Sequence, residues 1–271
     1  MARQVSINID DQAVKVVYAT RTGRKLKIVD TLIVPPDKLD DFLKDEKEKD
    51  FTVSADFRKA FFDTVYIPPV KKNLWKSLIN AELKKRHADG GPYTSVFFRT
   101  GQKVVEGHRM DEFFVYYVPS SEVDDLITRF LTHGKRVEAI YPNMMAVLKV
   151  LPKKEEPYLC LFESGSTKSF FLMMDGQVLF TRVVQSLGAG LSDYDIQNIN
   201  MTVNHCRQTL RIEPVHVLYF GNEPAEGTVS AKSSLSMEFF QPPDTLAVDR
   251  ASFQNFLITV CALGQIGRAH V

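Results

Sequence analysis

The amino-acid sequence predicts an α/β protein in which two related halves are separated by an inserted unit of strands and helices. A pattern of three short apolar strands joined by tight turns opens the chain and recurs after residue 157. The segment between the copies has its own strand–proline–helix pattern. These observations place the first half at 1–50 and 138–156, the insertion at 51–137 and the second half at 157–271.

The first half begins with three strands in hairpin order, at Val5–Ile9, Ala13–Ala19 and Leu26–Val34. Gly23 lies in the turn before the third strand, and Pro35-Pro36 ends that strand. After the insertion, a strand at Val137–Ile140 and a short helix at Met144–Val150 complete this half. All these elements are short, as expected where a sheet supplies most of the structure.

The insertion contains four apolar runs with strand character, two of them followed by amphipathic helices. The first helix is expected to be capped by Asn73, and the second to begin at Ser120-Ser121. Their apolar faces are predicted at Leu74, Trp75, Leu78, Ile79 and Leu83, and at Val123, Leu126, Ile127, Phe130 and Leu131. The four strands are predicted at Phe51–Ala55, Phe62–Ile67, Ser95–Arg99 and Phe113–Val118.

The second half repeats the opening pattern, with strands predicted at Leu159–Phe162, Phe170–Met174 and Val178–Val184. Asp175-Gly176 is a typical type I′ turn sequence between the last two strands. Three more elements follow: a long helix after Ser192, a strand at Val215–Phe220, and a last helix that carries Phe253, Phe256, Leu257, Val260 and Leu263.

The composition limits the function. Lys and Arg number 34 and Asp and Glu 33, so the chain lacks the basic excess typical of nucleic-acid binding. The three cysteines lie far apart in apolar runs, which favours buried free thiols over a disulfide. The six histidines show no metal-ligand spacing, so we expect no metal site. No apolar run approaches the ~20 residues of a membrane helix, which favours a cytoplasmic protein.

The two opening patterns can be aligned without a gap. Placing Asn8 opposite Glu163 sets Asp10 opposite Gly165 and Lys15 opposite Phe170. Both segments then consist of an apolar strand, an acidic or amide residue, a tight turn and a second apolar strand. This alignment indicates a duplicated structural unit.

The aligned segments resemble the actin-like superfamily, and within it the PilM and GspL proteins of pilus and secretion systems. The PilM-like Asp-Ile-Gly-x-x-x-Val-Lys segment corresponds to Asn8-Ile9-Asp10-Asp11-Gln12-Ala13-Val14-Lys15, and the second Asp-Ile-Gly loop corresponds to Glu163-Ser164-Gly165-Ser166-Thr167. The resemblance implies an actin-like (ribonuclease H-like) two-lobed fold with an inserted subdomain of the type found in the division protein FtsA.

Further segments of the chain are similar to landmarks of this family. Thr64-Val65-Tyr66-Ile67-Pro68 and the following helix with Glu82 resemble its strand–proline–helix subdomain. Phe180-Thr181-Arg182 resembles the end of its second meander, and Ala262-Leu263-Gly264 its terminal helix. Gly188-Ala189-Gly190 stands where the family has a glycine pair on the adenine side. The similarity therefore covers almost the whole chain.

The resemblance implies a nucleotide cleft between the halves, in a degenerate form. Gly165, Ser166 and Thr167 are suited to phosphate binding, and Glu163 can replace the family's aspartate. In the first loop, however, Asn8 lacks the charge to hold Mg²⁺. The candidate cleft residues are Asn8, Asp10, Asp11, Gln12, Lys15, Glu163, Gly165, Ser166, Thr167, Gly188, Gly190 and Gly221.

Asp10 and Asp11 lie where the phosphates of a nucleotide would sit. Each close pair of like charges costs about 1 kcal/mol even in water, and more in a cleft. We therefore expect no catalysis and no bound cofactor. The alternative is a PilM-like protein that still binds Mg-ATP, since departures from a motif are sometimes tolerated. An unrelated enzyme using one of the acidic turns is a third hypothesis, without a Walker loop or a catalytic triad pattern to support it.

The resemblance also implies a role and partners. A non-catalytic scaffold would link membrane components of a type IV pilus or type II secretion platform to the cytoplasmic assembly ATPase, at the inner face of the inner membrane. Its partners would be a PilN- or GspM-like inner-membrane protein, the ATPase and a second copy of itself as a homodimer. Candidate surfaces are the helix face at 74–83 and the exposed edge of the inserted sheet. Since GspL-like proteins continue into a membrane helix, we expect the native chain to continue beyond Val271.

Overall fold

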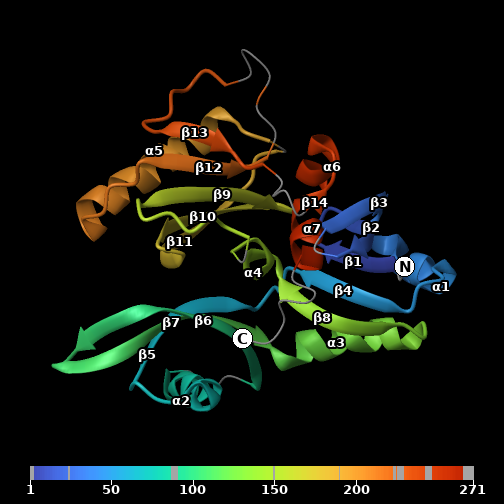
Figure 1. Cartoon of the computed structure of the whole chain (residues 1–271), viewed down its shortest axis with the longest axis horizontal. Helices are drawn as coiled ribbons and strands as arrows, with labels where there is room; N and C mark the ends of the chain where they lie inside the picture. The colour runs from blue at the N-terminus through green and yellow to red at the C-terminus, as the bar shows by residue number, and fades with distance from the viewer. Residues whose placement is uncertain are drawn as a thin grey trace. The chain divides into compact units, whose positions relative to one another are not determined.

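The computed structural model describes residues 3–23, 25–86, 91–148, 150–188, 190–221, 224, 229–241 and 246–264. The chain forms two compact units, one from Met1–Asp56 with Phe130–Val271 and one from Phe57–Arg129. The first unit contains a six-stranded and a five-stranded sheet, and the second contains a three-stranded sheet (Figure 1).

The six-stranded sheet begins with the predicted meander. Strands β1 (Arg3–Ile9), β2 (Val14–Thr22) and β3 (Lys25–Val34) are antiparallel neighbours. The other strands are parallel to their neighbours: β4 (Asp50–Ala55) pairs with β1 and with β8 (Arg136–Pro142), and β14 (Leu246–Ala247) pairs with β3. This order places the end of β1 in the middle of the sheet.

The strand at 50–55 lies in this sheet and not in the sheet of the insertion, where the sequence analysis placed it. Phe51, Val53 and Ala55 are buried, and the neighbouring Thr52 and Ser54 are buried as well. A strand buried on both faces fits the centre of a parallel array better than the edge of a small sheet. The domain limits 51–137 stay a prediction, while the compact inserted unit comprises Phe57–Arg129.

The five-stranded sheet repeats the topology of the first. Its meander consists of β9 (Tyr158–Ser164), β10 (Thr167–Met174) and β11 (Gln177–Gln185), followed by β12 (His216–Phe220) parallel to β9 and β13 (Ser236–Phe239) parallel to β12. Asp175 and Gly176 both have positive φ, 52° and 74°, which confirms the predicted type I′ turn. The orders β3-β2-β1-β4-β8 and β11-β10-β9-β12-β13 correspond strand by strand.

The two meanders differ in their first turn, which corrects the gap-free alignment of the repeats. Residues 10–13 connect β1 to β2, whereas only residues 165–166 connect β9 to β10. Asn8 is paired across the strands with Lys15, and Glu163 with Lys168. Lys168, and not Phe170, therefore corresponds to Lys15.

The helices of this unit bury the apolar residues predicted from their spacing. Helix α5 (Asp193–His205) begins with a capping box between Ser192 and Asp195, continues into a π-helical turn (Cys206–Leu210), and packs Ile196, Ile199 and Val203 against the five-stranded sheet. The predicted C-terminal helix is divided into α6 (Arg250–Asn255) and α7 (Leu257–Gly264), because Phe256 leaves helical geometry.

Helices α4 and α1 also belong to the first unit. The apolar helix α7 packs against β1, β2 and β4 and against the buried α4 (Asn143–Leu148). Helix α1 (Leu39–Asp45) follows a 3₁₀ turn (Pro36–Lys38) and buries Leu39 and Leu43. Of these helices, α7 lies against β1, whose end leads into the first turn.

The second unit consists of β5 (Phe61–Ile67), β6 (Tyr93–Val105) and β7 (His108–Pro119), with α2 (Trp75–Arg86) on one face. Ile79 and Leu83 of α2 are buried against a cluster that includes Phe113. The predicted cap at Asn73 is wrong: Asn73 lies inside a 3₁₀ turn (Lys72–Leu74) that leads directly into α2, so the extended Lys71 precedes the helical segment.

Helix α3 (Ser120–Thr132) connects the insertion to β8. Phe130 is its one fully buried residue among those described, and it packs edge-on against Phe51. Leu131, predicted on the apolar face, is 58% exposed, so the buried face is narrower than its residue types indicated.

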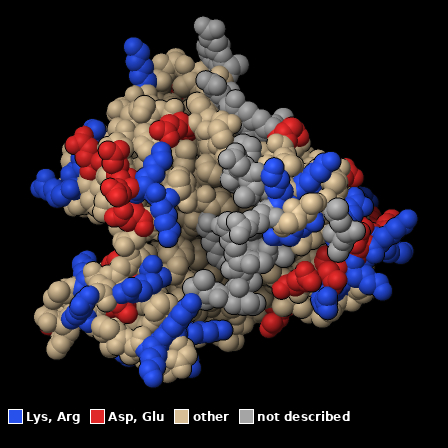
Figure 2. Space-filling view, viewed as in Figure 1, with Lys and Arg blue, Asp and Glu red and all other residues tan. Residues whose placement is uncertain are grey.

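Within the described ranges, none of the helices has the length and apolar character needed to cross a membrane. All three cysteines are free and buried. Figure 2 shows Lys and Arg beside Asp and Glu over the face in view, as a formal net charge of +1 would give.

Candidate functional site

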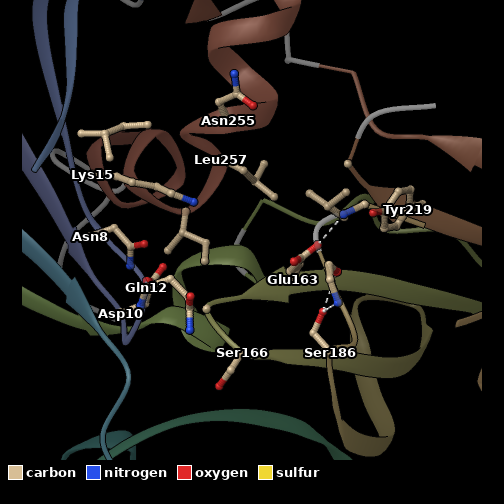
Figure 3. Close-up of a pocket in the computed structure, with 17 residues that line it drawn as sticks. Asn8, Asp10, Gln12, Lys15, Glu163, Ser166, Ser186, Tyr219, Asn255 and Leu257 are labelled. Atoms are coloured by element: carbon tan, nitrogen blue, oxygen red, sulfur yellow. Dashed lines mark hydrogen bonds between the residues drawn. The ribbon is translucent and has the colours of Figure 1, made fainter. Parts of the chain in front are cut away.

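A cavity of about 610 Å³ lies in the first unit, between the turns of the two meanders (Figure 3). Ten of the twelve predicted cleft residues line it, and Asp11 and Thr167 do not. The sequence analysis missed the remaining lining residues, which come from β3, the position after β11, β12, α6 and α7: Ile33, Ser186, Tyr219, Phe220, Asn255, Leu257 and Ile258. Whether the predicted set binds a ligand stays a prediction.

Asn8, at the end of β1, is 1% exposed and has a fixed amide orientation. Its Nδ2 donates to Asn143 Oδ1 at 2.8 Å and to Ser54 Oγ at 3.2 Å. Its Oδ1 is buried without a hydrogen-bond partner among the residues that the structure describes, and it points to the cavity side of β1 in Figure 3. The Nδ2 group of Asn8 is therefore hydrogen-bonded, whereas its Oδ1 has no hydrogen-bond partner among the described residues.

Asn143 continues this network to the second meander. Its Nδ2 donates to Ser164 Oγ at 2.9 Å, and that hydroxyl donates to Asp56 Oδ2 at 2.6 Å. Desolvation raises the pKa of Asp56, and hydrogen bonds from Ser164 and Asn143 partly offset the shift. No motif pointed to Asn143, because its role depends on a contact 135 positions away in sequence.

Asp10 hydrogen-bonds within its own turn. Its Oδ1 accepts from the backbone N–H of Gln12 at 2.9 Å and of Ala13 at 2.8 Å. An aspartate that bonds the backbone two and three residues ahead forms a compact turn of its own. The carboxylate therefore occupies two backbone donors of the first loop.

Asp11 reaches across to the second meander. Its Oδ1 accepts from the backbone N–H of Ser166 at 3.0 Å, and hydrogen bonding from Ser166 holds the pKa of Asp11 below its ordinary value. Gly165 makes this approach possible: its φ is +53°, and a Cβ there would lie 2.1 Å from Asp11 Oδ1. The tips of the two loops are thus directly bonded.

Glu163, at the end of β9, faces the cavity and is half-buried. Its Oε2 accepts from the backbone N–H of Gly190 at 3.1 Å (Figure 3). Desolvation raises its pKa, while the charge of Lys168 and the Gly190 hydrogen bond act in the opposite direction. The second carboxylate oxygen is turned toward the side of the cavity where Lys15 lies (Figure 3).

Lys168 lies behind Glu163 and has a fully buried side chain. Its Nζ donates to Asp195 Oδ2 at 2.8 Å and to the carbonyl oxygens of Gly188 and Gly190. The lysine thereby connects β10 to the start of α5 and to Gly188 and Gly190, whose segment we call the glycine loop. A charged lysine within an apolar strand could have indicated this role from the sequence. The gap-free alignment missed it because it matched Lys15 with Phe170.

Apolar and aromatic side chains of β12 and α7 also line the cavity: Tyr219, Phe220, Leu257 and Ile258. Tyr219 is 1% exposed, and a Cβ on Gly221 would lie 2.4 Å from its ring. Gly221 is therefore required for the position of the ring. Burial raises the pKa of the Tyr219 hydroxyl.

Over the described part of the chain, no three His, Cys, Asp or Glu side chains are grouped so that they could hold a metal ion. Thr167 directs its hydroxyl to the carbonyl of Ser164, 3.1 Å away, within the second turn. The lining of the cavity as a whole combines apolar side chains of β12 and α7 with Asn8, Glu163 and Lys15.

No family model and no curated protein matches the sequence. Solved structures do. PilM in the PilM–PilN type IV pilus biogenesis complex matches with a TM-score of 0.70 at 14% identity, over 98% of both chains. The cytoplasmic domain of EpsL, an inner-membrane component of the Vibrio cholerae type II secretion system, matches with a TM-score of 0.60 at 11% identity, over 97% of this chain and 95% of that one.

A protein of unknown function from Bacteroides thetaiotaomicron, described as having an actin-like ATPase fold, matches with a TM-score of 0.50 at 8% identity. The match covers 83% of this chain and 84% of the Bacteroides protein chain. Identities this low establish a shared architecture and not a shared activity. The chain therefore has the actin-like ATPase fold, and it resembles PilM and cytoplasmic EpsL over nearly its whole length.

Proposed function

We propose that this protein is a non-catalytic actin-like scaffold of a bacterial pilus or type II secretion platform, whose nucleotide cleft no longer takes Mg-ATP. The proposal combines the likeness to PilM and EpsL with the chemistry of the two loops. It places the chain at the cytoplasmic face of the inner membrane, with a PilN-like membrane protein and an assembly ATPase as partners.

The contact between Asp11 and the Ser166 amide carries the proposal. Phosphate loops bind through backbone N–H groups that are free to donate to phosphate oxygens. Here the amides of Gln12 and Ala13 donate to Asp10, and the amide of Ser166 donates to Asp11. The protein's own carboxylates thus occupy the donors that a triphosphate would need.

Charge and metal chemistry support the same conclusion. Two unit charges 4 Å apart repel by about 4 kcal/mol at the effective dielectric constant of a protein surface, which works against a phosphate beside Asp10 and Asp11. Mg²⁺ prefers carboxylate and water oxygens in octahedral geometry. Asn8 offers one amide oxygen, and its nitrogen is held by Asn143.

The alternative is a PilM-like protein that binds ATP in a modified site. A cavity of about 610 Å³ with glycines at 165, 188 and 190 favours this alternative, because the volume suits a small-molecule ligand. Binding would require Asp11 to leave Ser166 so that the loop amide became available.

Calorimetric titration of the full chain with Mg-ATP, together with a phosphate-release assay, tests the proposal. We expect no hydrolysis and no micromolar affinity. The Asp11→Ala variant frees the Ser166 amide and removes one charge, so any residual ATP affinity should be larger in this variant. Micromolar binding by the unmodified chain would establish the alternative.

A further inference from the structure

We infer that the exposed face of helix α2 binds the anionic headgroups of a phospholipid surface. This contact rests on the proposed function, which places the chain at the inner face of the inner membrane, and it adds a direct lipid attachment to the one made through protein partners. The charge of this face, its shape and one exposed leucine support the contact.

The segment from Lys71 to Arg86, which comprises the 3₁₀ turn and α2, is strongly basic. Six of its residues are Lys or Arg and one, Glu82, is acidic, whereas the whole chain has 34 basic and 33 acidic residues. Figure 2 shows Lys and Arg gathered where Figure 1 places α2. Basic residues concentrated on one helix are typical of a surface that binds anions. The six basic residues are all exposed: Lys71, Lys72, Lys76, Lys84, Lys85 and Arg86.

Packing on the inserted sheet turns the basic side of α2 outward. Ile79 and Leu83 are buried against the sheet, and the Trp75 ring contacts the Phe113 ring with 4.9 Å between centroids. The apolar side of the helix is therefore covered by its own sheet, and the basic side faces solvent.

Most of these charges have no counter-charge within the protein. Lys85 pairs with Glu82 and Arg86 with Asp63, each at 2.5 Å between nitrogen and oxygen. Across the described ranges, the other four basic residues of the segment form no ion pair within 4.0 Å. Neighbouring lysines of like charge repel one another, so an anionic surface that neutralises them is favoured.

The shape of this face favours a flat partner over a peptide. Hollows of about 610 and 570 Å³ both lie in the first unit, and no residue of α2 lines either of them. A peptide usually binds in a groove or along the edge of a sheet. The exposed side of a single helix offers neither, but it can lie along a layer of lipid headgroups.

Leu74 gives this face an apolar contact. Leu74, predicted on the apolar side of the helix, lies in the 3₁₀ turn and is 46% exposed. Helices that lie in a membrane interface combine lysines on the polar side with apolar residues that reach the acyl boundary. The long lysine side chains let the ammonium groups stay among the headgroups while a neighbouring leucine enters more deeply.

Sedimentation of the full chain with lipid vesicles tests the inference. We expect binding to vesicles of phosphatidylcholine mixed with phosphatidylglycerol, and none to vesicles of phosphatidylcholine alone. Raising the salt from about 0.1 M to about 1 M shortens the Debye length from about 10 Å to about 3 Å, so the binding should then be lost.

The double variant Lys76→Gln/Lys84→Gln should bind the anionic vesicles about 25-fold more weakly, because each basic residue near such a surface contributes about fivefold to the partition constant. The matched control is Lys25→Gln/Lys44→Gln, which removes the same charge from exposed lysines of the first unit and should leave the binding unchanged. Thermal unfolding of each variant establishes that it folds.

Absence of binding to the anionic vesicles, binding that persists without anionic lipid, or equal weakening by the two double variants would overturn the inference. Labelled polyglutamate that binds the chain and is not displaced by anionic vesicles would overturn it as well, in favour of an acidic protein partner. These outcomes leave the scaffold function standing, because the Mg-ATP titration tests the cavity of the first unit, in which α2 takes no part. Micromolar Mg-ATP binding would overturn the scaffold function and leave the vesicle result unchanged.

Discussion

Asn8 and Glu163 occupy corresponding positions in the two halves, each opposite a lysine on the neighbouring strand. Their surroundings differ. Asn8 is enclosed by Ser54 and Asn143, whereas Glu163 is half-buried and held by Gly190. Asn8 is therefore the more deeply enclosed of the two residues, although both line the cavity.

Replacing Asn8 with an aspartate should destabilise the fold. In an Asn8→Asp variant, a carboxylate oxygen replaces the nitrogen that donates to Asn143 Oδ1 and Ser54 Oγ, so an acceptor meets an acceptor inside the protein. We expect a loss of about 1–3 kcal/mol in the free energy of unfolding. Urea denaturation at neutral pH measures it, with the exposed Asn204→Asp as the control. Equal stability of the two variants would contradict the network.

The Asp11 contact should depend on pH. The folded-state pKa of this carboxyl is lowered from 3.8, so the contact contributes stability above that value, and the contribution is lost as the pH falls through the lowered pKa. The difference in unfolding free energy between the wild type and Asp11→Asn should therefore shrink as the pH falls from about 5 to about 2. A difference that stays constant over this range would argue against an ionised Asp11 in the contact.

Ten of the residues that line the cavity were named beforehand, because the two turns could be matched to PilM-like loops by their order and spacing. The sequence could not predict Asn143, Ser54 or Lys168, whose roles depend on which distant strands become neighbours. The first turns of the two meanders differ by two residues in length, and this was not visible in the sequence either. An alignment without gaps matches the first strands correctly and goes out of register only after the turn.

At the level of elements, strand β10, the glycine loop and helix α5 are joined through one side chain. Lys168 is buried with Asp195, and the same carboxylate accepts from Ser192 in the capping box. Helix α5 thus begins at a point set by the sheet. The long helix was correctly expected after Ser192, whereas the cap expected at Asn73 was wrong, because a 3₁₀ turn displaced the start of α2.

Lys168→Met should leave Asp195 as a buried charge without its ion-pair partner, and removing one partner of a buried pair typically costs 3–5 kcal/mol, so we expect about 3 kcal/mol or more. Denaturant unfolding measures the loss, and Lys25→Met, on the exposed start of β3, is the control. A change of less than about 1 kcal/mol would mean that Asp195 finds another donor or binds a proton.

At the level of the whole chain, two sheets of the same topology make up one unit, and the insertion interrupts it after β4. Predicting the insertion was possible because its strand–proline–helix pattern is local. The predicted insertion starts at residue 51, whereas the compact unit starts at Phe57, because β4 pairs with β1 and β8, and the sequence does not display that pairing.

Deleting the insertion distinguishes the limits of the compact unit, 57–129, from the limits predicted from the sequence, 51–137. Replacing residues 57–129 with a short Gly-Ser linker should leave a first unit that unfolds cooperatively, because β4 and β8 both remain. Replacing 51–137 removes β4 and the start of β8, and we expect no cooperative transition. Circular dichroism during thermal unfolding distinguishes them. Cooperative folding of the larger deletion alone would favour the limits predicted from the sequence.

The close approach of Gly165 to Asp11 has a consequence for the evolution of the sequence. A side chain at 165 collides with the carboxylate at 11, and a shorter residue at 11 removes both the obstacle and the bond. The two positions are therefore expected to change together: lineages that keep an aspartate at 11 retain glycine at 165, and lineages that lose the aspartate are free of the steric part of that requirement. A bond between the loops would then be inherited as a pair of residues or not at all.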